Sequence, residues 1–350
     1  MLGLGLALAE RGGVPLPLLR AGIRRLLDAR LDSARAAGGL DDFLRDLDNA
    51  PVALVPDAAN AQHYELPVEF FALFLGPHLK YSCATWPPGV ARLEDAEETA
   101  LALTCERAGL ADDQRILELG CGWGSLALFV AHRFPGAQVT AVSNSAIQRA
   151  FIESRRPANL AVVTADMNSF EPGTRFDRVV SVEMFEHMRN WRTLLGRIAT
   201  WLEDDGRLFV HVFCHARYAY PFESAGTGDW MGRHFFTGGI MPAYDLLPRA
   251  SDAFTLEDRW WLDGRHYQRT AATWRANLEA RRTEVLAVFR RHYGADAGLW
   301  YHRWRIFFVA CEELFGYNGG AEWGVGHYRL AQAGPARRIE ELFRAKEVTA

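Results

Sequence analysis

The sequence predicts an α/β fold with a doubly wound, largely parallel sheet and helices on both of its faces. Two observations indicate this fold. Helix and strand patterns alternate over residues 95–214, and a glycine-rich turn over residues 120–124 directly follows the first strand. Strands that are separated by helices of this length form parallel βαβ units with right-handed crossovers. We therefore expect a Rossmann-like core.

The elements of this core are expected from the spacing of apolar residues along the chain. The strands are expected at 115–119, 137–142, 160–164, 177–182 and 207–213. The helices before and between them are expected at 95–109, 125–133, 145–155 and 190–203. After Cys214 the alternation stops, and residues 215–300 are rich in aromatic side chains and arginine. This segment is expected to be an inserted substrate cap over the strand ends.

Helical patterns flank the core. Apolar residues occur at helical spacing over 17–45 and again from Pro67 to Leu79, and Pro87 and Pro88 predict an extended loop after Tyr81. The chain therefore divides into an N-terminal helical segment with a loop (1–94), the core (95–214), the cap (215–300), a segment that completes the core (301–334) and a C-terminal tail (335–350). A helix at 299–315 and a strand at Trp323–Leu330 are expected to complete the core. A charged surface helix is expected at 335–346.

Composition argues against several classes of partner. A net charge of −4 over 350 residues gives no electrostatic reason to expect a nucleic acid. No apolar run reaches the roughly 20 residues that a transmembrane helix needs, so no stable membrane insertion is expected. The apolar stretch Leu2 to Ala9 lacks a preceding basic residue and is expected to be a packed terminal segment. The five cysteines form no C-x-x-C pair, so no metal site or disulfide framework is expected, and a cytoplasmic location fits best.

The glycine turn predicts a nucleotide-containing cofactor at the carboxyl ends of the strands. Gly120, Gly122 and Gly124 lack Cβ atoms, so the backbone can turn tightly and approach a ligand closely. The dinucleotide pattern is G-x-G-x-x-G with an acidic residue about 20 positions later. Here the spacing is G-x-G-x-G, the second strand ends in Ser143-Asn144-Ser145, and a carboxylate, Glu118, lies within the first strand. A nicotinamide enzyme and a turn without a cofactor are the alternatives.

The third expected strand ends in Ala165-Asp166-Met167. An adenine amino group could donate to Asp166 there, with Met167 beside the ring. An aspartate at a strand end also commonly caps a helix, so this residue alone leaves both interpretations open.

Two carboxylates and an imidazole follow the fourth expected strand. In Val182-Glu183-Met184-Phe185-Glu186-His187-Met188, a helical turn would place Glu183 on one face with Glu186 and His187. An alkylamine with a pKa of about 10 must lose a proton before its nitrogen can accept a methyl group, and a carboxylate–imidazole pair can take it. The alternative is a helix-capping glutamate and a packed histidine.

These motifs together resemble the cyclopropane-fatty-acyl-phospholipid synthase superfamily, most closely its coclaurine N-methyltransferase-like branch. The motifs that carry the resemblance are Tyr81-Ser82-Cys83, residues 116–125, Val142 to Ser145 with Gln148, residues 182–188, Asp229-Trp230-Met231, Gly238-Gly239, His266 to Thr270, and residues 305–323. The resemblance covers roughly residues 60–330. It implies a class I methyltransferase that uses S-adenosylmethionine (SAM).

The resemblance also implies roles for individual residues. It implies that Tyr81 and Ser82 close over the cofactor, that the three glycines line its methionine part, that Asn144 and Gln148 approach the ribose, and that Asp166 and Met167 flank the adenine. Glu183, Glu186 and His187 match the residues to which the N-methyltransferases assign amine binding and deprotonation. The expected function is therefore methylation of a small, aromatic or heterocyclic amine.

Two other functions remain open. The lipid-modifying branch uses a bound bicarbonate as its base, held by residues that match Cys83, Glu186, His211 and Tyr267, all present here. Against this alternative, that branch typically has a small residue where this chain has Glu183, and it lacks the sequence Arg189-Asn190-Trp191. His211 favours the alternative, because the plant enzymes tend to carry Glu at that position. A SAM-binding protein without catalysis is the alternative of another class.

Two further groups of residues are weighed in the light of the resemblance. Cys311 matches a cysteine once treated as a nucleophile in the lipid branch, but it lies on an apolar helix face and is expected to be structural. The cap contributes many aromatic residues, most of them expected in the core and three or four facing the substrate: Tyr218, Tyr220, Phe222, Trp230, Phe235, Phe236, Tyr244, Trp260, Trp261 and Trp274.

Overall fold

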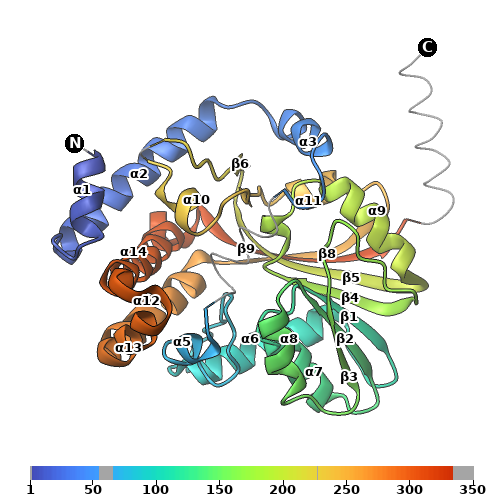
Figure 1. Cartoon of the computed structure of the whole chain (residues 1–350). Coiled ribbons are helices and arrows are strands. Elements are labelled where there is room, and N and C mark those ends of the chain that lie inside the picture. The colour runs from blue at the N-terminus through green and yellow to red at the C-terminus, as the bar shows by residue number, and fades with distance from the viewer. Residues whose placement is uncertain (1, 55–65, 227, 334–350) are drawn as a thin grey trace.

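The computed structural model describes residues 2–54, 66–226 and 228–333. A seven-stranded sheet with the strand order β3-β2-β1-β4-β5-β9-β8 forms its centre (Figure 1). The strands are β1 (Arg115–Leu119), β2 (Gln138–Ser143), β3 (Leu160–Thr164), β4 (Phe176–Val182), β5 (Leu202–His215), β8 (Phe254–Leu262) and β9 (Trp323–Gln332). The first five are parallel, whereas β9 is antiparallel to both β5 and β8. The expected α/β class with a Rossmann-like sheet is confirmed.

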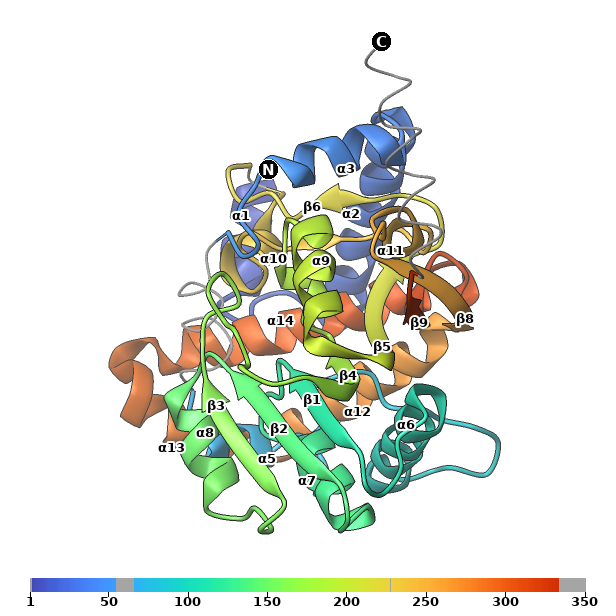
Figure 2. The ribbon, with the colours of Figure 1, turned by 90° about the vertical axis from the view of Figure 1, so that its right-hand side faces the viewer.

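Helices cover both faces of this sheet (Figure 2). Because side chains alternate along a strand, Ile116 of β1 packs in one core cluster and its neighbour Leu117 in another. The first cluster includes residues of α6 (Leu93–Ala108), α7 (Ser125–Arg133) and α8 (Ala146–Glu153). The second includes residues of α3 (Leu40–Asp48), α9 (Trp191–Trp201) and α11 (Leu246–Arg249).

A third cluster lies among helices beside the sheet, at the left of Figure 1. Its helices are α2 (Leu16–Ala36), α5 (Val68–Ala72), α12 (Gly264–Ala280), α13 (Arg282–Tyr293) and α14 (Ala297–Gly316). Short elements of the cap complete the layer: β6 (Tyr220–Pro221), α10 (Trp230–His234) and β7 (Ile240–Met241). The helices α12 and α14 carry several of the side chains that line the site described below.

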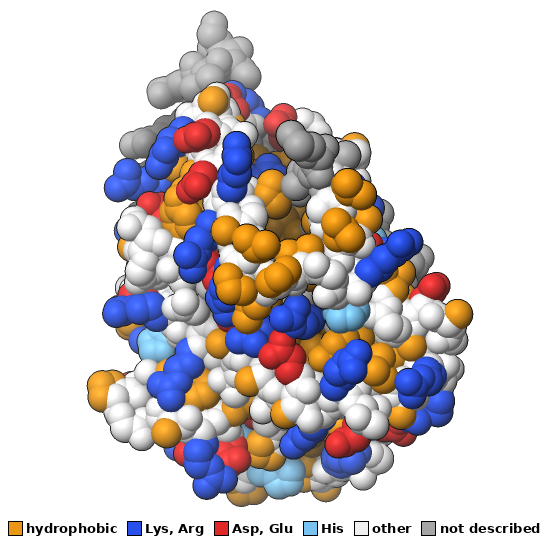
Figure 3. All heavy atoms as spheres, turned by 90° about the vertical axis from the view of Figure 1, so that its left-hand side faces the viewer, with side chains coloured by type: hydrophobic (Ala, Val, Ile, Leu, Met, Phe, Trp, Pro, Cys, Tyr) orange, Lys and Arg blue, Asp and Glu red, His pale blue; other side chains and the backbone are white. Residues whose placement is uncertain are grey.

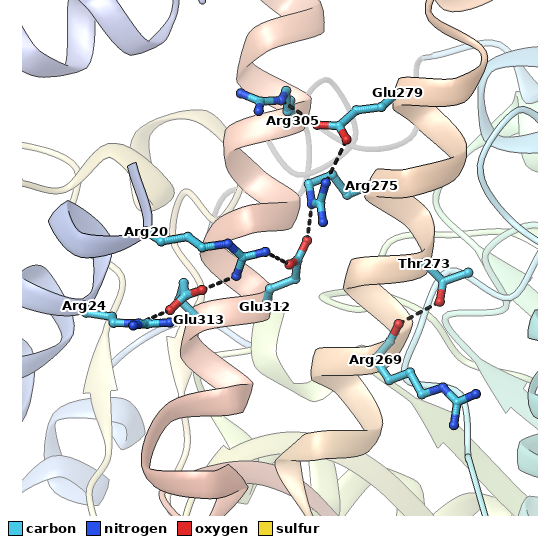
Figure 4. A network of polar contacts seen from close by, with 9 residues as sticks. All are labelled: Arg20, Arg24, Arg269, Thr273, Arg275, Glu279, Arg305, Glu312 and Glu313. Carbon is cyan, nitrogen blue, oxygen red and sulfur yellow. Dashed lines mark hydrogen bonds and ion pairs between the residues drawn. The ribbon is translucent and has the colours of Figure 1, made fainter. Parts of the chain in front are cut away.

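Ion pairs fasten the N-terminal helix α2 to this helical layer (Figure 4). Arg20 bonds to Glu312 and Glu313 of α14, and Arg24 bonds to Glu313. Arg275 of α12 bonds to the other oxygen of Glu312. The side chains of Glu312 and Glu313 are only 3% and 4% exposed, so these carboxylates depend on their arginine partners.

We expect the change Glu312→Ala to lower the free energy of unfolding by about 3 kcal/mol, because it removes a buried carboxylate that pairs with both Arg20 and Arg275 and leaves each arginine with a single remaining carboxylate partner. Urea unfolding at neutral pH would measure this loss. Asp41→Ala is the control, since it breaks a surface pair with Arg249 whose side chains are 72% and 50% exposed, and its cost should stay under about 0.5 kcal/mol. Equal losses in the two variants would contradict the clamping role of the network.

The structure corrects several expected elements. The segment 215–300 was expected to be a cap alone, but it contains β8, which forms the edge of the main sheet. The helix expected from Pro67 to Leu79 is only α5, because Gly76 and Pro77 interrupt the helical pattern. The strand expected at 207–213 is longer in β5. The charged surface helix expected at 335–346 lies outside the described residues.

The terminal segment Leu2 to Ala9 forms the helix α1, and it is less packed than expected. Ala9 is buried, but Leu4 and Leu8 are exposed, as is Leu18 at the start of α2. The face of the molecule that carries these two helices shows hydrophobic side chains gathered among arginines (Figure 3).

Candidate active site

The glycine turn forms a cradle after β1. Gly120, Gly122 and Gly124 have φ angles of 79°, 52° and 80°, in the region that favours glycine. A Cβ atom at Gly120 would lie 2.8 Å from the side chain of Met184, whereas one at Gly122 would meet no protein atom within 4 Å. The space in front of Gly122 is therefore open to a ligand.

A cavity of about 760 Å³ lies over this turn, at the carboxyl ends of the parallel strands. Its lining includes most residues expected to bind the cofactor, namely Gly120, Gly122, Asn144, Gln148, Asp166 and Met167, and it also includes Glu183 and His187. An adjoining cavity of about 580 Å³ is lined by Tyr81, Ser82 and Glu118 together with Gly120 and Gly122. Gly124 lines neither cavity; it precedes the first residue of α7.

Two buried polar atoms at these cavities suit SAM. Oε2 of Glu118 and Nε2 of Gln148 make no hydrogen bond within the described chain. The free carboxylate oxygen could accept from the ammonium group of SAM, and the amide could donate to a ribose hydroxyl. Asp166 accepts hydrogen bonds from Asn168 at 2.9 and 3.1 Å, so it supports its own turn while lining the cavity.

Glu183 lies at the centre of the site, where β4 ends. Its φ of 48° is unusual for a residue with a side chain, and its backbone N–H donates to the carbonyl of His211. Oε1 accepts from the backbone N–H of Cys83 at 2.9 Å and lies 3.1 Å from Nε2 of His211. Oε2 accepts from the hydroxyl of Tyr267 at 2.6 Å. Groups from three parts of the chain thus hold one carboxylate.

Burial governs the protonation of this group and its neighbours. It raises the pKa of Glu183, while the nearby charge of Lys80 opposes that rise. It lowers the pKa of His187 to about 4, against the opposing charge of Glu183. It also lowers the pKa of Lys80, which donates to Ser82 and to the carbonyl of Cys83 at 2.6 Å each. At neutral pH His187 is a neutral imidazole, and Glu183 is a stronger base than an exposed glutamate.

Glu186 lies elsewhere than the helical-face argument predicted. The helical turn is a short 3₁₀ segment, Phe185–His187, and Glu183 precedes it in a left-handed conformation, so the two glutamates do not share a face. Glu186 is fully buried, and its Oε1 accepts from the backbone N–H of Phe213 at 2.7 Å. It is absent from the linings of the cavities that contain Glu183 and His187.

A third cavity, of about 680 Å³ and called the acceptor cavity below, meets the cofactor cavity at Glu183 and His187. Three of the ten cap aromatics line it, namely Phe222, Phe236 and Trp274, together with Tyr81, Tyr267, Phe307 and Cys311. His187 stacks on Phe236 with ring centroids 5.5 Å apart. Burial raises the pKa of the Cys311 thiol, which disfavours a thiolate nucleophile.

Four polar residues near the site were not expected from the sequence. Lys80 is one of two lysines in an arginine-rich chain, and that rarity was a signal that could have drawn attention to it. Thr270 accepts from the backbone N–H of Ala84 and from the indole of Trp86, which fixes the loop after Tyr81. His327 and Arg107 continue a hydrogen-bonded chain beyond His211, and they come from segments too distant in sequence to be associated with it.

The strand order, the glycine cradle and the cofactor cavity at the carboxyl ends of the strands define a class I SAM-dependent methyltransferase. Residues 55–320 match the family described as mycolic acid cyclopropane synthetase, and the chain belongs to this family. The expected family, enzyme class and cofactor are thereby confirmed.

Similar proteins include plant enzymes. The chain is 34% identical over 297 residues to (S)-coclaurine N-methyltransferase of Thalictrum flavum subsp. glaucum, covering 82% of each chain. It is 33% identical to the enzyme of the same name from Papaver somniferum, covering 91% of this chain and 95% of that one. A crystal structure of coclaurine N-methyltransferase bound to N-methylheliamine and SAH superposes with a TM-score of 0.89 at 33% identity, covering 93% and 98%.

No helix among the described residues is both long and apolar enough to span a membrane.

We expect SAM binding at pH 7 to release about one proton, because burial raises the pKa of Glu118 to about 8 and a bound ammonium group would lower it again. At pH 7 the free enzyme therefore holds this proton and the complex does not. Calorimetry in buffers of different ionisation enthalpy would measure the release. In Glu118→Gln the release should disappear, and in the wild type it should fade above about pH 9. Identical proton release in both proteins would contradict this role of Glu118.

Proposed function

We propose that the chain transfers a methyl group from SAM to the nitrogen of a small aromatic or heterocyclic amine. The position of the Glu183 carboxylate is the observation that carries the proposal. Cys83, His211 and Tyr267, which the resemblance assigns to bicarbonate in the lipid-modifying branch, all contact this carboxylate. The carboxylate of Glu183 therefore already accepts hydrogen bonds from the groups that would hold a bicarbonate, so a bound bicarbonate is not required as the base.

The cofactor cavity would hold SAM and the acceptor cavity the amine, with Glu183 and His187 between them. When bound, SAM supplies a methyl group activated by a positively charged sulfur. Glu183 and His187 line both cavities, so they face the nitrogen at the junction where the methyl group passes. Glu183 accepts the proton of the incoming ammonium group, which frees the nitrogen lone pair, and its raised pKa suits it to this transfer. Neutral His187 assists as an acceptor or donor to the amine.

The acceptor cavity favours an aromatic cation. Its walls are the rings of Tyr81, Phe222, Phe236, Trp274 and Phe307, and Glu183 provides its charge. Aromatic faces attract a desolvated ammonium group by roughly 1–2 kcal/mol through cation–π interaction, and they stack against the apolar part of the same ligand. An unsaturated acyl chain would gain the apolar contacts alone.

A screen with methyl-labelled SAM tests the proposal. The acceptors are cyclic secondary amines fused to an aromatic ring, phenols of matched shape, and vesicles of phospholipids with unsaturated acyl chains, each with and without bicarbonate. We expect label in the amines, with no dependence on bicarbonate. Label in lipid alone, stimulated by bicarbonate, would replace the proposal with lipid methylation. Tight SAM binding without transfer to any acceptor would indicate a non-catalytic protein.

A further inference from the structure

A buried chain of hydrogen bonds leads from Glu183 away from both cavities. Nε2 of His211 lies 3.1 Å from Oε1 of Glu183, and Nδ1 of His211 lies 2.8 Å from Nε2 of His327. Nδ1 of His327 lies 2.9 Å from Nη1 of Arg107, near the end of α6. His211 and His327 are direct cross-strand partners on β5 and β9, and they are 2% and 1% exposed.

The chemistry at the two ends fixes the direction of every bond in this chain. A guanidinium group only donates, so Nδ1 of His327 must be an acceptor and its Nε2 must carry the proton. That proton points at Nδ1 of His211, which makes the Nε2–H of His211 the donor to Glu183. Burial and the charges of Lys80 and Arg107 lower the pKa of His211. Burial, His211 and the same two charges lower the pKa of His327. Both rings are therefore neutral Nε2–H tautomers.

The same directionality prevents the chain from conducting a proton. Nε2 of His211, the atom that faces Glu183, already carries a proton and cannot accept another, unless His211 first moves a proton to Nδ1, where it would meet the Nε2–H of His327. His327 could relieve that clash only by moving its own proton to Nδ1, where Arg107 already donates. A proton taken up by Glu183 therefore cannot leave through His211.

We propose that Arg107 and His327 are positioning residues that hold His211 as a neutral donor to Glu183, so that the carboxylate keeps its charge and does not lose its proton through His211. This inference rests on the proposed function of Glu183 as the base. Neither Arg107 nor His327 lines the cavities that contain Glu183.

Other ionisable groups face both ends of the chain. Lys80, Cys83, Tyr267 and His187 surround Glu183 and stay unchanged in the variants below. Charge from Glu106 and Tyr244 reaches Arg107, and Arg329 donates to the carbonyl of Arg107 at 3.3 Å. The guanidinium groups of Arg107 and Arg329 lie 4.8 and 5.9 Å from the ring centroid of Trp260.

Arg329→Met is therefore the control for Arg107→Met, and it also breaks the ion pairs of Arg329 with Glu257 and Asp258. Each change removes one arginine from the indole of Trp260, but only Arg107→Met removes the donor to His327. Arg107→Lys keeps a positive donor and should restore the wild-type behaviour. His327→Leu interrupts the chain at its middle. Unchanged SAM affinity in each variant would show that the fold is intact.

In Arg107→Met and His327→Leu, we expect the fall of kcat on the acid side of its pH dependence to occur about one pH unit higher than in the wild type. Without the donor from His327 or the charge of Arg107, His211 takes a second proton at a higher pH, and the imidazolium then neutralises Glu183. Above this pH range kcat should recover to within about threefold of the wild type. Arg329→Met and Arg107→Lys should keep the wild-type pH dependence. A loss of kcat by the same factor at every pH, without a shift, would overturn the inference.

Nitrogen-15 NMR of the imidazole rings gives a readout that needs no substrate. In the wild type at pH 7 both His211 and His327 should be neutral with the proton on Nε2. In Arg107→Met the ring of His211 should titrate within the accessible pH range. An imidazolium or an Nδ1–H tautomer in the wild type would overturn the inference even if amine methylation is found. If both rings are the expected tautomers but no amine is methylated, the proposed function is wrong and the positioning of His211 still stands.

Discussion

Glutamine in place of Glu183 should reduce kcat by about 10²- to 10⁴-fold, the range that a positioned general base contributes. The amide keeps the shape of the side chain and an oxygen for the backbone N–H of Cys83, but it cannot take the proton of the amine. His187→Ala should also lower kcat by orders of magnitude. The affinity for SAM, measured by calorimetry, should change by less than about threefold in both variants, since the cradle and Glu118 are intact.

Glu186→Gln distinguishes a base from a buried structural carboxylate. Its amide oxygen can still accept from the backbone N–H of Phe213, and the residue lines neither cavity at Glu183. We expect a loss of kcat below about tenfold, well short of the loss in Glu183→Gln. Equal losses in these two variants would contradict the assignment of the base to Glu183, and a full-activity Glu183→Gln enzyme would exclude it.

The second large effect is expected from a single methyl group in the cradle. In Gly122→Ala the new Cβ meets no protein atom within 4 Å, so it enters the cofactor cavity. Overfilling a packed site costs about 1–3 kcal/mol, which corresponds to SAM binding roughly 5- to 150-fold weaker. Titration of SAM followed by calorimetry would measure the change.

Gly173→Ala provides the matched control for backbone strain. Gly173 has a φ of 70°, and a Cβ atom at this position would also meet no protein atom within 4 Å, but the residue lines none of the cavities at the site. Both variants should lose a similar amount of stability from the left-handed backbone, and only Gly122→Ala should lose SAM affinity. Weaker binding in both would show that strain, and not contact with the cofactor, is responsible.

The sequence predicts the core of this fold well because each element has its own periodic signal. The glycine turn, the strands at 115–119 and 160–164, and the helices that cover them follow from local patterns. The strand β8 was not predicted, because its residues Glu257, Asp258 and Arg259 are polar, as an edge strand allows. The helix expected after Pro67 was too long because its apolar residues continue into a turn.

Parts of the candidate site depend on contacts that no local pattern contains. The motif over 182–188 identifies Glu183 and His187, but the conformation of Glu183 separates it from Glu186 in a way that residue spacing does not reveal. Lys80 is adjacent to a recognised motif, whereas its burial against Cys83 depends on the packing of distant segments. The partnership of His211 and His327 depends on the antiparallel register of β5 and β9, over a separation of 116 residues.

The left-handed backbone at Glu183 has a consequence for the substitutions that this position accepts. Glycine adopts a φ of 48° without the cost that a side chain incurs, so the loss of this glutamate relaxes the chain at that position. A glutamate codon becomes a glycine codon by one base change. The three donors would then face an empty space with the size and charge preference of a small oxyanion. A single mutation would thus remove the base carried by the protein and leave room for one that diffuses in, without rebuilding the fold.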